Sequence, residues 1–105
     1  MTHPPFSSIE AALAAIARGE VIIVVDAEDR ENEGDFICAA EKVTPEIVNF
    51  MITEGRGLLC TPILPEVCER LQLVPACDGN STPTGTPFYT QIDHRSVKTG
   101  ITAQE

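Results

Sequence analysis

An acidic decapeptide between two apolar runs limits most strongly what this chain can fold into. Residues 26–35, Asp-Ala-Glu-Asp-Arg-Glu-Asn-Glu-Gly-Asp, carry six carboxylates in ten positions. The preceding run, residues 21–25, is almost entirely β-branched, which is typical of a strand covered on both faces. The following run, residues 36–40, also has the composition of a strand. The sequence therefore predicts two strands joined by an acidic loop that holds like charges close together.

Capping signals predict two helices around these strands. The first extends over residues 7–19, where Ser7 and Glu10 form a capping box. The second opens at Thr44, which is followed by a proline at the first helical position and by an acid near the positive end of the helix dipole. This second helix is expected to end at Gly55.

The remainder of the chain continues the alternation of helices and strands. A short helix is expected over residues 65–71, and two further strands are expected over residues 58–63 and 88–92. This alternation favours a layered α/β fold. Residues 75–87 are rich in Gly, Pro, Asn, Ser and Thr, which indicates an exposed loop and a candidate lid. Thr102 opens a further capping box, which predicts the start of another helix and favours truncation of a larger domain.

The charge and the cysteines exclude several classes of protein. Seven Lys and Arg against sixteen Asp and Glu give a net charge of −9, which disfavours binding to nucleic acid or to an anionic membrane. The sequence contains no apolar run long enough to span a membrane, so a cytoplasmic location is expected. The four cysteines form no CxxC pair, and we expect reduced, mostly buried thiols. Cys60 is kept as a candidate functional thiol.

The acidic decapeptide is either a solvated, self-repelling surface loop or a cation site. Because the flanking strands prevent its carboxylates from drifting apart, some pKa values rise or a cation is recruited. A hard divalent cation suits carboxylate oxygens, with water and substrate oxygens completing the octahedron that Mg²⁺ prefers. A calcium-binding EF-hand loop that starts at Asp29 is excluded, because its twelfth position is Ala40 instead of glutamate.

The other residues of the decapeptide suggest a reaction. Arg30 either neutralises its acidic neighbours or orients a hydroxylated or carbonyl substrate beside the metal. Gly34 permits a positive φ or a close backbone approach that turns Asp35 back toward the site. These parts suit proton abstraction beside a carbonyl, with the metal stabilising an enediolate while carboxylates move protons. These residues therefore favour a magnesium-dependent enzyme that acts beside a carbonyl group.

At this decapeptide the chain resembles the 3,4-dihydroxy-2-butanone 4-phosphate synthase family. The family signature Asp-x-Glu-Asp-Arg-Glu-Asn-Glu-Gly-Asp is present from Asp26 to Asp35. The resemblance covers nearly the whole chain through further segments: Ala40-Glu41, Gly55-Arg56-Gly57-Leu58-Leu59-Cys60, Gly85-Thr86-Pro87-Phe88 and Thr99-Gly100-Ile101-Thr102-Ala103.

The resemblance implies a carbon-carbon lyase of riboflavin biosynthesis. Such an enzyme converts D-ribulose 5-phosphate into 3,4-dihydroxy-2-butanone 4-phosphate and formate, uses Mg²⁺ or Mn²⁺, and is commonly a homodimer. The implied fold is a three-layer α/β arrangement in which helices flank a mixed β-sheet, here incomplete.

The resemblance also implies roles for individual residues. Glu31 is a metal ligand, Arg30 and Glu31 contact the substrate, and Asp35 binds the sugar and moves protons. Glu33 is a further acid–base group. Two residues outside the decapeptide are carried over as well: Cys60, near the family's mobile active-site loop, and Thr99, close to the substrate.

The sequence departs from the family pattern because it lacks the motif that carries the second metal ligand. The family's other metal ligand is a histidine in a Gly-His-Thr-Glu type motif, accompanied by phosphate-binding residues and another catalytic glutamate, and this motif is absent. Residues 1–105 are therefore expected to form the amino-terminal portion of a single synthase domain. Two alternatives remain: a non-catalytic fragment that binds metal or dimerises without turnover, and a plain structural domain with a solvated acidic face.

Overall fold

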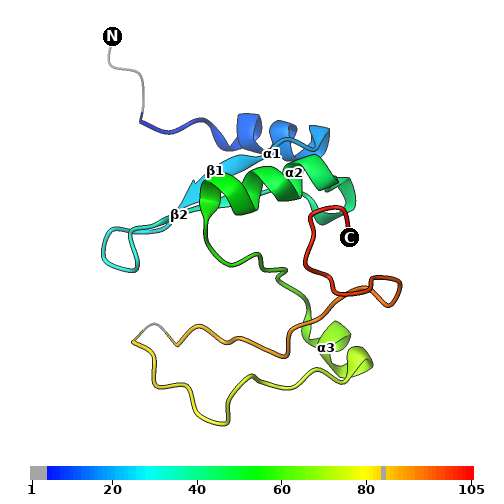
Figure 1. Ribbon diagram of the computed structural model, residues 1–105. Coiled ribbons are helices and arrows are strands. Elements are labelled where there is room, and N and C mark those ends of the chain that lie inside the picture. The colour runs from blue at the N-terminus through cyan, green and yellow to red at the C-terminus, as the bar shows by residue number, and fades with distance from the viewer. Residues whose placement is uncertain (1–4, 84) are drawn as a thin grey trace. The chain divides into compact units, whose positions relative to one another are not determined.

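The computed structural model describes residues 5–83 and 85–105, in which one helix precedes a two-stranded hairpin and further helices follow it (Figure 1). The chain divides into two compact units, a first unit of Met1–Leu59 and a second unit of Cys60–Glu105. The elements follow in the order α1 (Ile9–Arg18), β1 (Ile22–Val25), β2 (Gly34–Ile37), the 3₁₀-helix η1 (Ala40–Lys42), α2 (Pro45–Phe50), the π-helix η2 (Met51–Gly55) and α3 (Pro65–Leu71).

Helix α1 begins one residue later than the capping pattern predicts. Ser8 adopts an extended conformation, and its hydroxyl oxygen accepts a hydrogen bond from the Ala11 N–H at 3.2 Å. The prediction of a capping box from Ser7 to Glu10 was therefore wrong. With Ser8 as the cap, Glu10 occupies the second helical position, whereas the box requires the third. The predicted end at Gly19 is confirmed, because this glycine takes the left-handed conformation with φ 83°.

Strands β1 and β2 form an antiparallel hairpin on either side of the acidic loop. The pairs run from Ile22 with Ile37 to Val25 with Gly34. Alternation along the strands places Phe36 on the same face as its direct partner Ile23. This hairpin confirms the two predicted strands, although the second spans Gly34–Ile37 instead of residues 36–40.

Helix α2 and the π-helix η2 cover part of that face. Thr44 caps α2 by accepting a hydrogen bond from the Ile47 N–H, as the sequence predicts. The ring of Phe50 lies 5.1 Å from that of Phe36, measured between centroids. At Gly55, where the helical segment ends as predicted, an added Cβ would lie 3.2 Å from the Phe36 ring. A side chain at this position would therefore disturb the contact between η2 and β2.

The described residues of the second unit form one helix and a long loop. Helix α3 has the predicted bounds, Pro65–Leu71. The expected strands over residues 58–63 and 88–92 were wrong, since the only sheet in the described part of the chain consists of β1 and β2. Residues 88–92 contribute only an isolated antiparallel bridge, between Tyr89 and Pro75. A strand requires a neighbouring backbone with which to pair, and a sequence pattern cannot reveal whether that neighbour is present.

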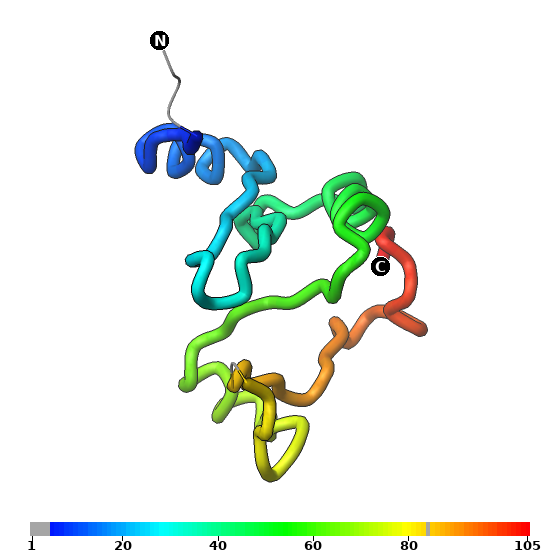
Figure 2. Tube along the Cα trace, turned by 90° about the vertical axis from the view of Figure 1, so that its left-hand side faces the viewer, coloured from blue at the N-terminus to red at the C-terminus, as the bar shows by residue number. Residues whose placement is uncertain are grey.

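The bridge between Tyr89 and Pro75 closes the expected loop over residues 75–87, which Figure 2 shows in yellow. Inside the loop the Asn80 amide donates to the Thr86 carbonyl oxygen at 2.9 Å and accepts a hydrogen bond from the Thr82 hydroxyl. Residue 84 lies outside the described residues. The role of residues 75–87 as a lid stays a prediction.

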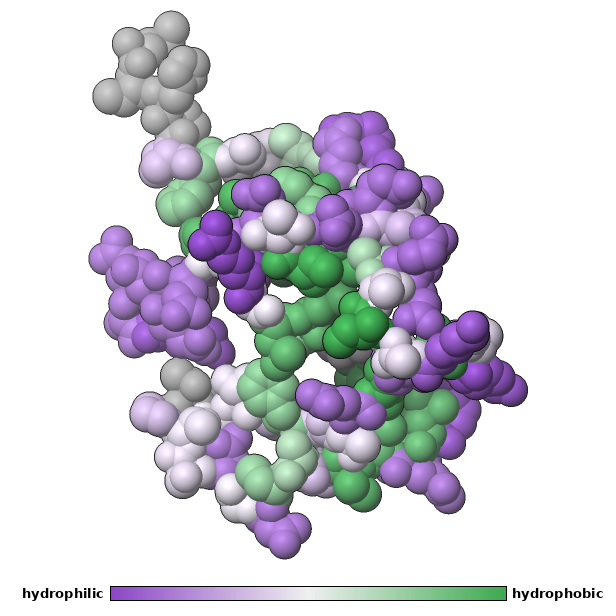
Figure 3. All heavy atoms as spheres, in the orientation of Figure 1, coloured by the Kyte–Doolittle hydropathy of each residue, from purple (hydrophilic) through white to green (hydrophobic). Residues whose placement is uncertain are grey.

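Apolar side chains remain largely exposed throughout. None of the described residues, 5–83 and 85–105, is buried, and Val24 and Val25 of β1 are 43% and 48% exposed. The expectation of a strand covered on both faces was therefore wrong for this chain. Green apolar surface is visible on the face shown in Figure 3. No helix in the described segments is long and apolar enough to cross a membrane.

Candidate functional site

The acidic loop is closed by backbone hydrogen bonds at its base and by a turn within it. Beyond the last strand pair, the Asp26 N–H donates to the Glu33 carbonyl oxygen at 3.2 Å. The Arg30 N–H donates to the Ala27 carbonyl oxygen at 3.0 Å, and Asn32 adopts the left-handed conformation with φ 53°. The loop is therefore a folded continuation of the hairpin and not an extended tether.

The carboxylate of Asp26 is the centre of hydrogen bonding in this loop. Its Oδ2 accepts hydrogen bonds from Arg30 Nη1 at 2.9 Å and from the Glu31 N–H at 3.0 Å. Its Oδ1 accepts from the Glu33 N–H at 2.8 Å. The two backbone N–H groups, first that of Glu33 and then that of Glu31, lower the pKa of Asp26, and the guanidinium of Arg30 lowers it further. Asp26 was not among the site residues that the sequence predicts.

Arg30 joins Asp26 to Glu31. While Nη1 of Arg30 contacts Asp26, Nη2 lies 2.9 Å from Glu31 Oε1. The hydrogen bond to Asp26, followed by the charge of Glu31, raises the pKa of Arg30, and the charge of Asp35 adds to this effect. The structure therefore brings two predicted site residues, Arg30 and Glu31, into direct contact. Neutralisation of acidic neighbours, one of the two roles expected for Arg30, is visible here.

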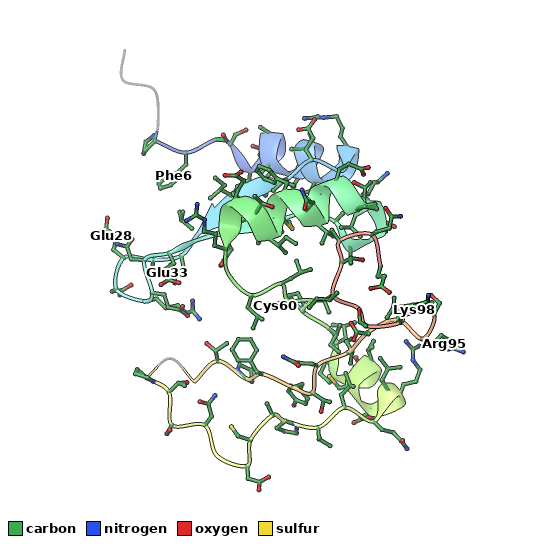
Figure 4. All side chains as sticks on the ribbon, viewed as in Figure 1. Phe6, Glu28, Glu33, Cys60, Arg95 and Lys98 are labelled. Atoms are coloured by element: carbon green, nitrogen blue, oxygen red, sulfur yellow. The ribbon has the colours of Figure 1, made fainter. Side chains whose placement is uncertain are left out.

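Glu33 and Asp35 lie near the end of the loop. Figure 4 shows Glu33 in the same loop as Glu28. Asp35 belongs to β2, pairs with Val24 and is exposed. The expected close approach at Gly34 is present, since an added Cβ would lie 3.3 Å from Ile23 Cγ2. A positive φ is absent at this glycine and occurs at Asn32 instead.

The loop offers oxygen donors for a divalent cation. Among residues 5–83 and 85–105, no group of three or more His, Cys, Asp or Glu side chains is arranged to hold a metal ion. Mg²⁺ is commonly bound through only one or two protein carboxylates, with water and substrate oxygens supplying the other ligands. The donor chemistry of Glu31 therefore fits such an ion, although its Oε1 is paired with Arg30.

The two other predicted site residues belong to the second unit. Cys60 is its first residue and is exposed. Cys60 and Cys77 are exposed, and Cys38 and Cys68 are half-buried, so the expectation of mostly buried thiols was wrong. The Thr99 hydroxyl donates to Glu105 Oε2 at 3.4 Å.

Glu105 organises the segment of residues 98–105. Its Oε1 accepts a hydrogen bond from the Lys98 N–H at 3.0 Å, and this bond is the main cause of the lowered pKa of Glu105. The Glu105 N–H donates to the Thr102 hydroxyl at 3.3 Å. This is one of the two reciprocal hydrogen bonds that the predicted capping box requires. Gly100 has φ 67°, and an added Cβ there would clash with the Asp93 carboxylate.

Comparison with known proteins extends these observations. The chain is 58% identical to riboflavin biosynthesis protein RibBA of Bacillus subtilis and 59% identical to that of Bacillus velezensis, over 105 residues in both cases. All of this chain is covered, but it spans only about a quarter of the length of these relatives, 25% of each.

Two solved structures resemble the fold. A two-domain 3,4-dihydroxy-2-butanone 4-phosphate synthase from A. baumannii is 43% identical with a TM-score of 0.84, covering 94% of this chain and 29% of that one. A synthase of the same name, in complex with two magnesium ions, is 38% identical with a TM-score of 0.87, covering 95% of this chain and 47% of that one. These matches confirm the predicted α/β fold class, of which the chain contains a part.

The match to the family itself covers most of the sequence. Residues 10–105 match the model of the family described as 3,4-dihydroxy-2-butanone 4-phosphate synthase. The matched region contains the acidic hairpin and the segment around Thr99 and Glu105. This chain therefore belongs to the 3,4-dihydroxy-2-butanone 4-phosphate synthase family.

Proposed function

We propose that this chain supplies part of the active site of a lyase in riboflavin biosynthesis. The reaction converts D-ribulose 5-phosphate into 3,4-dihydroxy-2-butanone 4-phosphate and formate. The observation that carries the proposal is the acidic hairpin loop, in which the family signature from Asp26 to Asp35 folds so that Arg30 and Glu31 are in contact. The names of the relatives and of the similar structures support the same reaction class.

The loop residues divide the chemistry among them. Arg30 binds and orients the hydroxyl and carbonyl oxygens of the substrate through its planar fork of N–H donors. Asp35 binds the sugar and exchanges protons with it, and Glu33 is a second acid–base group. Glu31 contacts the substrate and holds a divalent cation, Mg²⁺ or Mn²⁺, through a carboxylate oxygen. Such an ion, when bound, supplies positive charge where negative charge develops on the substrate oxygens.

Two further residues belong to the proposed site. Thr99 lies close to the substrate, and Cys60 lies beside a mobile active-site loop. The magnesium proposal is supported by the similar synthase whose structure holds two magnesium ions. We further propose that the enzyme is a cytoplasmic homodimer, with residues 1–105 as the amino-terminal portion of one synthase domain.

A non-catalytic fragment that binds metal or dimerises without turnover is the second candidate. It is favoured by one specific observation, which is that Glu31 Oε1 is paired with Arg30 Nη2 at 2.9 Å. In that case this chain would carry only a weak cation site.

Formate release from ribulose 5-phosphate in the presence of Mg²⁺ separates the two candidates. It is measured for the 105-residue chain and for the complete gene product that contains it. We expect formate from the complete product and none from the chain alone, because the histidine of the Gly-His-Thr-Glu type motif is absent from this sequence. Formate from neither protein would reject the lyase, and formate from both would show that the hairpin suffices without that motif.

A further inference from the structure

We propose that Asp26 is the positioning residue of the acidic hairpin loop. Its carboxylate fixes the Arg30 side chain and the backbone of Glu31 and Glu33, which are the residues that would meet the substrate and the metal. This inference rests on the proposed function, because those three residues are assigned to the site there. Asp26 itself is not among the residues to which the resemblance gives a role.

The two oxygens of Asp26 hold different parts of the loop. Oδ2 holds the guanidinium of Arg30 and the N–H of Glu31, at 2.9 and 3.0 Å. Oδ1 holds the N–H of Glu33 at 2.8 Å. These distances are short enough for good hydrogen bonds, and an ionised acceptor strengthens each of them. One side chain thus determines where three functional residues of the loop lie, namely Arg30, Glu31 and Glu33.

The relative exposure of the side chains indicates which residue positions the others. The Asp26 side chain is 23% exposed, whereas that of Arg30 is 53% and that of Glu31 is 34% exposed. Asp26 is also the residue that directly follows β1, and its own N–H is bonded to the Glu33 carbonyl oxygen. The inner, backbone-anchored carboxylate therefore holds the outer groups, and these remain accessible to a ligand.

The orientation of the Arg30 guanidinium depends on the Asp26 carboxylate. Its Nη1 contacts Asp26 and its Nη2 contacts Glu31, so two carboxylates determine the orientation of the guanidinium plane. An asparagine at position 26 has one acceptor oxygen and an NH₂ group, which cannot accept from Arg30 or from a backbone N–H. Replacing Asp26 by Asn therefore leaves at least one of the three donors without its partner and releases part of the loop.

The test uses Asp26→Asn in the complete gene product, with Glu28→Gln as the matched control. Glu28 is an exposed acid in the same loop, so its replacement removes the same charge (Figure 4). We expect kcat/KM for formate release to fall roughly 100-fold in Asp26→Asn, because a displacement of about 1 Å in positioned groups costs about that much. In Glu28→Gln we expect it to stay within about twofold of wild type.

Two further variants distinguish positioning from a general loss of structure. Asp26→Glu keeps the charge on a side chain that is longer by one methylene, so its activity is expected to fall between those of wild type and Asp26→Asn. Asp26→Asn combined with Arg30→Lys is expected to lose less activity than the two single losses combined, since part of the effect of Asp26 passes through Arg30. Additive losses, or Asp26→Glu below Asp26→Asn, would overturn the proposal.

Amide hydrogen exchange provides a readout that does not depend on turnover. In Asp26→Asn the Glu31 and Glu33 amides are expected to exchange at least tenfold faster than in wild type, while amides of α3 are unchanged. If wild type forms no formate, the proposed function fails and the exchange data still decide whether Asp26 holds the loop. If wild type is active and Asp26→Asn matches it in both exchange and turnover, the positioning role is wrong and the proposed function stands.

Discussion

Two carboxylates organise two parts of this chain in different ways: Asp26 in the acidic hairpin of the first unit and Glu105 in the segment 98–105 of the second. Asp26 accepts hydrogen bonds from two backbone N–H groups and one side chain, whereas Glu105 accepts from the Lys98 N–H and from two hydroxyl groups. Asp26 makes its bonds at 2.8 to 3.0 Å. Glu105 accepts one bond at 3.0 Å from the Lys98 N–H, whereas those from Thr99 and Thr102 are 3.4 Å long.

The surroundings of the two carboxylates explain this difference. Next to Asp26 the strand pair Val25 with Gly34 holds both ends of the loop, so the donors are already close to the acceptor. Residues 98–105 contain no regular element, and their arrangement depends on turns and on the carboxylate itself. A hairpin base thus lets one carboxylate fix several functional groups, whereas an irregular segment leaves the same kind of carboxylate with longer, weaker bonds.

The largest expected effect is at a residue that Asp26 holds. Glu31→Gln in the complete gene product removes the proposed metal ligand, and we expect formate release at limiting Mg²⁺ to fall about 100-fold or more. Glu28→Gln, the exposed control in the same loop, is expected to stay near wild type. A Mg²⁺ titration of the initial rate measures both. Equal losses in the two variants would mean that Mg²⁺ responds to the total charge of the loop and not to Glu31 as a ligand.

The backbone of the segment 98–105 is the next test. Gly100→Ala places a side chain at φ 67° against the Asp93 carboxylate, and we expect a loss of about 1–3 kcal/mol in unfolding free energy. Gly79→Ala is the matched control, because an added Cβ at Gly79 meets nothing within 4 Å. It should change stability by less than about 0.5 kcal/mol. Urea unfolding measures both, and equal stability would show that the Gly100 turn relaxes freely.

The local signals in the sequence predicted the helices and the hairpin, but the two further strands that they predicted are not formed in the described residues. Pro65 and the apolar pattern after it predicted α3 with its observed bounds, since a helix satisfies its hydrogen bonds within one segment. The strand expected at residues 58–63 was wrong because strands depend on partners elsewhere. At the site, charge and the family signature drew attention to Arg30 and Glu31. The position of Asp26 at their centre depends on loop geometry, which spacing alone does not give.

Replacing the second carboxylate sharpens the comparison further. Glu105→Gln keeps the length of the side chain but weakens three acceptor contacts, two of which are long. We expect a two- to tenfold loss in kcat/KM, which corresponds to about one ordinary hydrogen bond. Glu69→Gln in α3 removes the same charge from an exposed position and should have no effect. A loss as large as that of Asp26→Asn would show that both carboxylates position the site equally.

The smallest expected effect is the dependence of stability on pH. The folded state lowers the pKa of Asp26 and of Glu105 below their ordinary values of 3.8 and 4.5. Their contribution to stability is therefore fully present above those values and is lost as the pH falls through the lower folded pKa. Thermal unfolding between pH 6 and pH 3 should show a decline that begins near about pH 4.5 and is shallower in Asp26→Asn. An unchanged slope in that variant would contradict the lowered pKa of Asp26.

The most direct test of the central claim is the product balance of the complete gene product with ribulose 5-phosphate and Mg²⁺. The account predicts formate and 3,4-dihydroxy-2-butanone 4-phosphate in equal amounts, with both products lost when a chelator removes the metal and restored when Mg²⁺ is added back. Substrate consumption without formate, or formate release that persists after chelation, would contradict a metal-dependent lyase built on the acidic hairpin.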